Sequence, residues 1–186
     1  MDPDELLTLV EVHLVNVLGH ESGRASVSFL GTDPIDVLRF GPDAEGLVRY
    51  ATLGMSRAPM SGSSELTTEG PRAELLLSVR GAQDSVLRRL GVLAASPGVE
   101  GVVISAGAGL DLGEPLWDGA RFTAVLVGEP GGLVPDLEGV QFLPLLPMTP
   151  NEAAWKRVHG TEALQERWLS QGCDLRDPAR PEADLR

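Results

Sequence analysis

The sequence predicts an α+β fold, in which a mixed, largely antiparallel sheet packs with about three to four helices in a single domain. The length of 186 residues and the hydrophobic share of 42% are sufficient for one buried core. Helical and strand-like periodicities follow one another in the order helix, strands, helix, strands, helices. This order lacks the regular strand–helix alternation of parallel α/β folds, so a mixed or antiparallel sheet is favoured.

The chain begins with the signals of a helix start. Asp2 can cap the helix, Pro3 suits its first position, and Glu5 stands three residues after Asp2. Gly19 can end the same helix. The apolar residues between these ends recur at helical spacing and form one face: Leu6, Leu7, Val10, Leu14, Val17 and Leu18.

Four strands and one long loop are predicted before the next helix. The strands are Ser26–Leu30, Ile35–Phe40, Leu47–Leu53 and Arg72–Arg80, the last with alternating apolar side chains. The segment Met55–Pro71 is rich in Ser, Gly, Pro and Met, and we expect an ordered loop there. Loops of this length inside a compact domain are often functional.

A second helix is predicted after Asp84, with its end at Pro97-Gly98. A long loop is expected over residues 105–119. Pro144 cannot donate to a strand ladder, so we expect the final strand to lie at a sheet edge or a bulge. The three strands predicted in this half are Val99–Ser105, Phe122–Val127 and Val140–Leu146.

Helices are predicted again near the C-terminus. The run Thr149-Pro150-Asn151-Glu152 combines a capping box with a proline at the first helical position. Gly160 then breaks or kinks the helical pattern. We expect residues 1–172 to form the domain and residues 173–186, which are polar and contain prolines, to form a loosely held tail.

The net charge of −12 limits the classes of partner. Nucleic acids and anionic lipids both require basic surfaces, so we expect neither nucleic acid nor membrane as a partner. A basic protein is favoured instead, although acidity also serves solubility alone. The start of the chain has no secretory pattern, no apolar run is long enough for a membrane helix, and Cys173 is the sole cysteine. A cytoplasmic location is expected, and the oligomeric state is left open.

No metal or cofactor site is predicted. His13 and His20 are seven residues apart, whereas helical metal-binding pairs are usually three or four apart. The glycines of Gly107-Ala108-Gly109 are followed by acidic residues, which repel phosphate. A plain turn is the better interpretation of that segment.

One arrangement allows an enzyme as an alternative. Gly54-Met55-Ser56-Arg57-Ala58 approaches a nucleophile elbow, and Asp136 and His159 complete the order of a hydrolase triad. The elbow lacks its second glycine, and Pro59 follows where a helix should begin. A hydrolase using Ser56 and His159 is therefore disfavoured.

Acidic residues concentrate between Glu100 and Glu138. This stretch holds seven acids and one base, Arg121, which gives a net charge of −6. We expect these acids to form a rim that binds a partner, together with a tryptophan anchor, because tryptophan is enriched at binding hot spots. Scattered solvated turn residues are the alternative for the acids, and core packing is the alternative for Trp117. The candidate binding residues are Asp111, Glu114, Trp117, Asp118, Glu129, Asp136 and Glu138.

Three motifs, in order along the chain, resemble the suppressor of fused domain family. The first is a strand that enters a turn at Tyr50–Met60, where Gly54, Met55, Ser56, Pro59 and Met60 form the family-motif loop. The second is Arg72–Leu77 and the third is Phe142–Thr149, followed by helix residues that include Glu152 and His159-Gly160. Together they span roughly residues 20–170 and identify a single-domain member.

The resemblance implies an α+β fold and protein binding without known enzymatic activity. Bacterial single-domain relatives look like immunity proteins of toxin systems, so the resemblance implies a cognate toxin as partner, and the acidic composition favours a basic one. An adaptor that binds an extended peptide by strand addition is an alternative, with Val140–Leu146 as the edge strand. No cofactor is implied.

Overall fold

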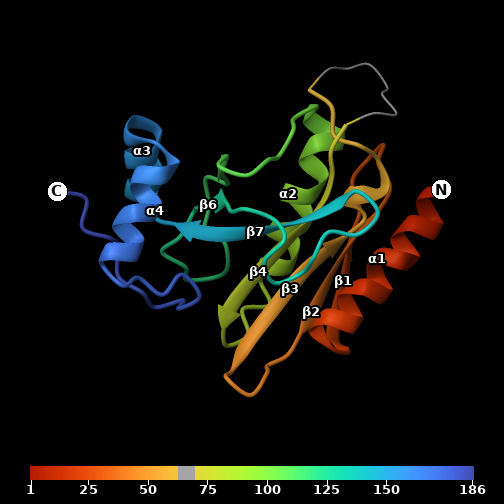
Figure 1. Ribbon diagram of the computed structural model, residues 1–186, viewed down its shortest axis with the longest axis horizontal. Coiled ribbons are helices and arrows are strands. Elements are labelled where there is room, and N and C mark those ends of the chain that lie inside the picture. Colours follow the sequence, from red (N-terminus) through yellow and green to blue (C-terminus); the bar gives the residue numbers. More distant parts are fainter. Residues whose placement is uncertain (63–69) are drawn as a thin grey trace.

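The computed structural model describes residues 1–62 and 70–186. Its centre is a sheet of seven strands in the order β1-β2-β3-β4-β7-β6-β5 (Figure 1). All neighbouring strands are antiparallel except β4 and β7, which are parallel. The predicted mixed, largely antiparallel sheet is therefore confirmed. The strands are β1 (Glu21–Val27), β2 (Ile35–Phe40), β3 (Leu47–Leu53), β4 (Arg72–Arg80), β5 (Gly109–Asp111), β6 (Ala124–Val127) and β7 (Val140–Met148).

Helices cover both faces of the sheet and one end of it. Side chains alternate between faces along a strand, so Leu76 packs with α1 whereas Leu75 and Leu77 pack on the other face with α2. Helices α3 and α4 form a third apolar cluster over β6 and the end of β7 (Figure 1). The helices are α1 (Pro3–Leu18), α2 (Val86–Glu100), α3 (Pro150–His159) and α4 (Thr161–Ser170), with a short 3₁₀ helix η1 (Met55–Arg57).

The predicted helix starts at both ends of the chain are confirmed. Asp2 accepts a hydrogen bond from the backbone N–H of Asp4 at 3.0 Å. At α3, the side chain of Thr149 accepts from the N–H of Glu152, and the Glu152 carboxylate accepts from the N–H of Thr149. These local contacts satisfy backbone donors that a helix leaves free, and so they position α1 and α3.

The predicted strand Val99–Ser105 is wrong, because α2 continues through Pro97 to Glu100. Pro97 has no N–H for the carbonyl of Leu93, but the hydroxyl of Ser96 donates to that carbonyl at 2.7 Å. The helix ends only at Gly101, in the left-handed region with φ 68°. Helical hydrogen bonding thus continues past the proline expected to stop it.

Two other strand predictions shift. The first strand runs over Glu21–Val27 instead of Ser26–Leu30, because its register on β2 places Val27 opposite Ile35. Residues 105–119, expected to be loop, contain β5, which pairs with β6 through Gly109 opposite Leu126. Within the predicted loop Met55–Pro71, residues 63–69 lie outside the described residues.

Strand β7 is internal, so of the two positions expected from Pro144, a sheet edge or a bulge, the edge is wrong. Pairing with β4 ends where Leu76 lies opposite Pro144, and β7 then pairs with β6 on its other side. The missing N–H of Pro144 therefore falls where the strand changes partner, and its carbonyl accepts from the N–H of Gly128 at 2.8 Å. A proline is tolerated at that point of an internal strand.

The expectation of a loosely held tail over residues 173–186 is wrong. Arg180 is only 2% exposed and its guanidinium bonds to Glu152 on α3. Ala183 is buried as well, and its N–H donates to the same carboxylate. The polar sequence concealed this because the partner of Arg180 lies on a separate helix.

Candidate functional site

The family-motif loop Gly54–Met60 is anchored on a buried carboxylate that the sequence analysis did not single out. Glu74 on β4 is fully buried. It accepts hydrogen bonds from the N–H groups of Gly54, Met55 and Ser56, at 3.0, 3.2 and 2.9 Å. The hydroxyls of Ser56 and Thr52 donate to it as well. An acid within an otherwise apolar stretch of β4 was the signal that could have found it.

The environment of Glu74 makes this loop a fixed structural unit. Burial raises the pKa of Glu74, and its hydrogen bonds act in the opposite direction. Arg72 adds to the anchoring by donating from Nη1 to the carbonyls of Ser56 and Arg57, each at 2.8 Å. The loop is therefore held from two positions on β4.

The structure does not bring the hydrolase residues together. Ser56 is fully buried, and its hydroxyl donates to Glu74. His159 is exposed at the end of α3, where its ring stacks on Trp155 with centroids 4.1 Å apart. η1, which carries Ser56, contacts α1, whereas α3 contacts β6 and β7. Asp136 lies in a third segment, before β7, so this geometry gives Ser56 no histidine as general base.

Among residues 1–62 and 70–186, no group of three or more His, Cys, Asp or Glu side chains could hold a metal ion. In the same ranges, no helix combines the length and apolar character needed to cross a membrane.

Trp117 is not a surface anchor. Its side chain is 3% exposed and packs against Phe122, with ring centroids 5.9 Å apart. The loop that carries it folds back onto the core, since the N–H of Leu116 donates to the carbonyl of Phe122 at 2.9 Å. Trp117 therefore stabilises the fold, and the prediction that it lies at a binding surface is wrong.

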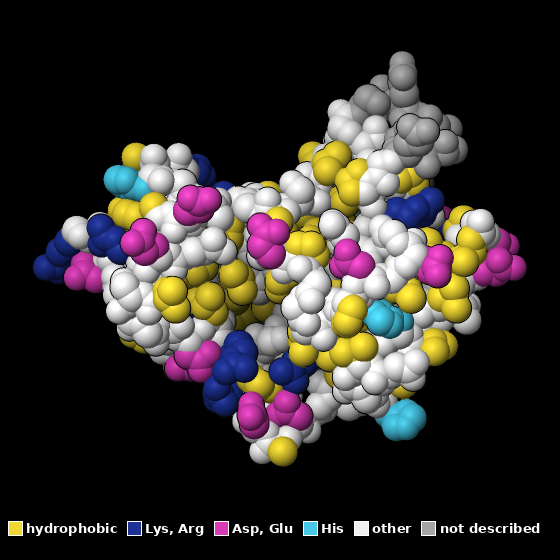
Figure 2. All heavy atoms as spheres, viewed as in Figure 1, with side chains coloured by type: hydrophobic (Ala, Val, Ile, Leu, Met, Phe, Trp, Pro, Cys, Tyr) yellow, Lys and Arg dark blue, Asp and Glu magenta, His cyan; other side chains and the backbone are white. Residues whose placement is uncertain are grey.

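The acidic residues do not form one rim. Asp111, Glu114 and Asp118 lie near α2 and β5, whereas Asp136 and Glu138 belong to the connection that packs on the α1 face through Val134. Glu129 lies at the start of this same connection. On the face seen in Figure 2, acidic side chains are distributed from one end of the molecule to the other and do not form one continuous patch.

Arginines partly neutralise the first acidic group. Arg89 on α2 lies 3.3 Å from Asp118 and 3.7 Å from Glu114. Arg157 on α3 lies 3.2 Å from Asp111. The three carboxylates are exposed, so these pairs stabilise little and leave the carboxylates open to water and to a partner.

A groove of about 400 Å³ runs between α2 and β5, which is the last strand of the sheet. The three valines that line it are exposed by 38–45%: Val92 on α2, and Val102 and Val103 in the following segment. Three acids, Glu100, Asp111 and Glu114, also line the groove, together with one base, Arg89. Val102 and Val103 were missed because the sequence analysis placed residues 99–105 in a strand.

The groove offers two means of holding a protein. Exposed valines in a concave surface favour an apolar partner surface. Among the described residues no strand pairs with the outer side of β5, so its backbone groups are open to an added strand. The acids beside the valines add a preference for basic groups.

Comparisons with known proteins agree with the fold. The sequence model of Suppressor of fused protein (SUFU) matches residues 31–181. A solved structure of a SUFU homologue from Neisseria gonorrhoeae is similar, with a TM-score of 0.76, 18% identity, and coverage of 96% of this chain and 97% of that one. A search of the curated proteins finds no significant match.

Two further solved structures are similar. The Sufu–Fu complex gives a TM-score of 0.67 at 13% identity, with coverage of 95% of this chain and 91% of that one. Drosophila Suppressor of Fused gives a TM-score of 0.59 at 14% identity, with coverage of 94% of this chain and 50% of that one. At these identities the structural likeness shows the fold alone.

Proposed function

Because this chain belongs to the suppressor of fused family, we propose that it is a protein-binding module that holds its partner in the groove between α2 and β5. The observation that carries the proposal is the row of exposed valines beside an open strand edge. One similar structure is described as a Sufu–Fu complex, so a protein of this fold has been solved with a partner. The function needs no catalytic group, cofactor or metal.

Strand addition is the binding mode that we propose, at β5 instead of Val140–Leu146. β7 has neighbours on both sides, so an added strand finds no continuous edge there. β5 is short and exposed, and the groove beside it can receive alternate side chains of an extended segment. The peptide-binding adaptor and the protein-binding module are therefore a single proposal, with strand addition at β5 as the way the partner binds.

A basic partner is the finer part of the proposal. Glu100, Asp111 and Glu114 border the groove in a chain of net charge −12. An immunity protein that neutralises a basic toxin domain in the cytoplasm is the form of this function that we propose. A toxin-like gene beside the gene for this chain would support that form.

Affinity capture from the native host tests the groove itself. We expect Val103→Asp to lose the captured partner, because a charge would then stand among the apolar side chains that line the groove. Leu169→Asp is the matched control, since Leu169 is 85% exposed on α4 and does not line the groove. Equal capture by the two variants would place the partner elsewhere.

Charge reversal tests the basic partner separately. We expect Asp111→Lys with Glu114→Lys to weaken binding of the captured partner and to reduce its dependence on salt. Unchanged affinity and salt dependence would contradict a basic partner but leave the apolar groove in place.

A further inference from the structure

Strands β4 and β7 are neighbours for only part of their length. Their pairing ends at Leu76, which lies opposite Pro144. Beyond this point β7 pairs with β6, beginning with Leu145, while β4 continues beside β3 as far as Arg80. The two strands therefore diverge, and a gap opens within the sheet.

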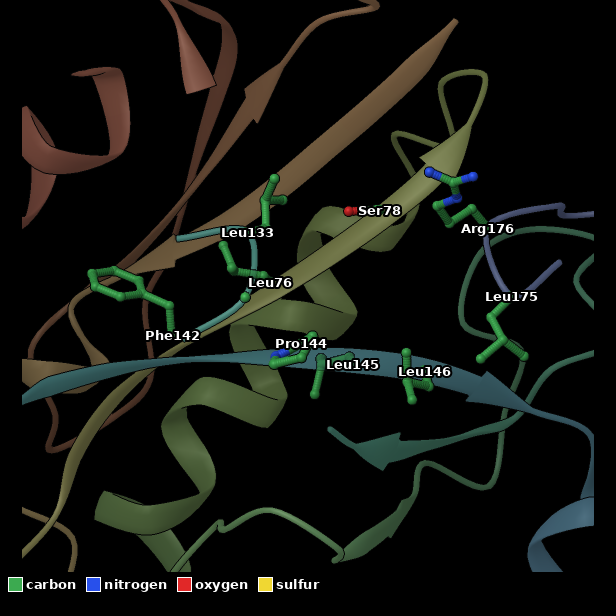
Figure 3. A pocket seen from close by; sticks show the side chains of 10 residues that line it. Leu76, Ser78, Leu133, Phe142, Pro144, Leu145, Leu146, Leu175 and Arg176 are labelled. Carbon is green, nitrogen blue, oxygen red and sulfur yellow. The ribbon is translucent and has the colours of Figure 1, made fainter. Parts of the chain in front are cut away.

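An apolar cavity of about 160 Å³ occupies this gap (Figure 3). It is open to solvent, because Leu133 in its wall is 44% exposed. An apolar cavity of about 150 Å³ holds a group the size of benzene, so this one matches the side chain of Leu, Ile or Phe. The main lining side chains are Leu76, Ser78, Leu133, Pro144, Leu146 and Leu175.

The backbone of β4 offers hydrogen-bonding groups beside the cavity. The N–H of Arg80 donates to the carbonyl of Arg176 at 2.8 Å, across the wide end of the gap. The pleat repeats every two residues, so the backbone groups of Ser78 point into the gap as well. No strand among residues 1–62 and 70–186 pairs with Ser78 on that side.

The border of the cavity is basic. Arg176 lines it, and Arg80 stands beside Arg176 at the end of β4. Both arginines contact Asp174, at 3.5 Å and 3.0 Å respectively. Arg176 is the one charged side chain among the residues that line the cavity, although the chain as a whole carries −12. Figure 2 shows basic side chains next to an apolar hollow, with acidic side chains on their outer side.

We propose that the cavity between β4 and β7 is a second docking site, which takes an apolar side chain from an extended, acidic segment of a partner protein. The apolar side chain fills the cavity, the segment's backbone bonds to Ser78, and an adjacent carboxylate pairs with Arg176. Leu76 belongs to the α1 face of the sheet, whereas the groove beside β5 lies on the α2 side. The two sites thus lie on opposite faces and prefer opposite charges.

Capped pentapeptides test the chemistry of this site on the full chain. We would titrate Gly-Glu-Leu-Glu-Gly, Gly-Glu-Ala-Glu-Gly and Gly-Lys-Leu-Lys-Gly while following backbone amide signals by NMR. The first should move the signals of Ser78 and Leu133 and bind about tenfold or more tightly than the alanine peptide, which buries fewer apolar groups. The lysine peptide should bind more weakly than the glutamate peptide. Equal binding of the three, or shifts spread over the surface, would overturn the proposal.

Variants of the cavity test its location. Ser78→Phe should fill the cavity and abolish binding of Gly-Glu-Leu-Glu-Gly, and Leu133→Ala should weaken it if Ser78→Phe does not fold. Arg176→Glu should reverse the preference between the glutamate and lysine peptides. Arg88→Glu is the matched control, because Arg88 is exposed on α2 and does not line the cavity. An unchanged preference in Arg176→Glu would sink the proposal.

The second site can fail independently of the first. Val103→Asp should leave binding of Gly-Glu-Leu-Glu-Gly unchanged, since Val103 lines the other groove. Loss of peptide binding in that variant would show that the peptide uses the β5 groove and that the β4–β7 cavity is not its site.

Discussion

Arg180 and Glu152 form a buried ion pair, with Nη2 of Arg180 2.8 Å from Oε1 of Glu152. The two side chains are 2% and 0% exposed. The guanidinium also lies over the ring of Phe122, 4.8 Å from its centroid, and Trp168 donates from Nε1 to Glu152 at 2.9 Å. The segment after α4 is thereby fastened to α3, and it closes the apolar cluster at that end of the sheet.

Removing one partner of this pair should destabilise the protein strongly. Arg180→Met leaves a carboxylate buried without its cation, so we expect a loss of about 3–5 kcal/mol in the free energy of unfolding, measured with urea. Arg186→Met is the matched control, because the side chain of Arg186 is exposed. A loss no larger than that of the control would show that this pair does not hold the C-terminal segment.

The same pair should make stability depend on pH in the acid range. Burial alone raises the pKa of Glu152, but hydrogen bonds from Arg180, Thr149 and Trp168 outweigh it and lower the pKa below its model-peptide value of 4.5. The unfolded chain then binds the proton more tightly. The contribution of Glu152 to the free energy of unfolding is therefore present above pH 4.5, and it is lost as the pH falls through the folded-state pKa of Glu152.

Urea unfolding at a series of pH values checks this contribution. The double variant Glu152→Gln with Arg180→Met should lose stability less steeply below pH 4.5 than the unaltered protein. If both proteins lose stability equally steeply as the pH falls, other carboxylates cause the loss of stability in acid.

Glu74 should be needed to hold the family-motif loop. Both of its oxygens accept from backbone N–H groups, so either orientation of the amide in Glu74→Gln sets an NH₂ group against a donor. We expect a loss of about 2–4 kcal/mol in unfolding free energy. Glu45→Gln, at an exposed position, should be close to neutral. Thermal unfolding followed by circular dichroism compares the two, and equal midpoints would contradict the role of Glu74.

Gly91 should be required for the close approach of α2 to β1. A Cβ at Gly91 would lie 2.7 Å from Cγ2 of Val27. Gly91→Ala should therefore cost about 1–3 kcal/mol, despite the better helix propensity of alanine. In a Val27→Ala background the same change should cost less, and a double-mutant cycle by urea unfolding measures the difference. Gly98→Ala on the same helix meets nothing within 4 Å and serves as the control.

Local signals explain the parts of the fold that could be predicted. The start of α3 follows from four adjacent residues, because Thr149 and Glu152 bond to each other's backbone wherever the helix lies. The motifs at Tyr50–Met60 and Arg72–Leu77 likewise predicted the family, which the match over residues 31–181 confirms. The structure adds that these two motifs touch, through Glu74 and the N–H groups of the loop.

The candidate sites could be predicted only in part. The sequence located Asp111 and Glu114, yet the exposed valines beside them became apparent only when α2 was seen to extend past Pro97. The cavity between β4 and β7 has no sequence signal at all, because it forms where two strands that are distant in sequence diverge.

The sequence by itself therefore determined the helix starts, the α+β class, the family and the acidic charge, all of which depend on composition or on neighbours along the chain. The tertiary structure alone decided that β7 is internal, that Trp117 and Arg180 are buried, and that Val102 and Val103 are exposed. Strand pairing and burial depend on partners far away in the sequence, and Arg180 is the clearest case. From the sequence, the charge of Arg180 predicts a solvated tail. In the structure, Nη2 of Arg180 lies 2.8 Å from Oε1 of Glu152, a residue 28 positions earlier in the chain.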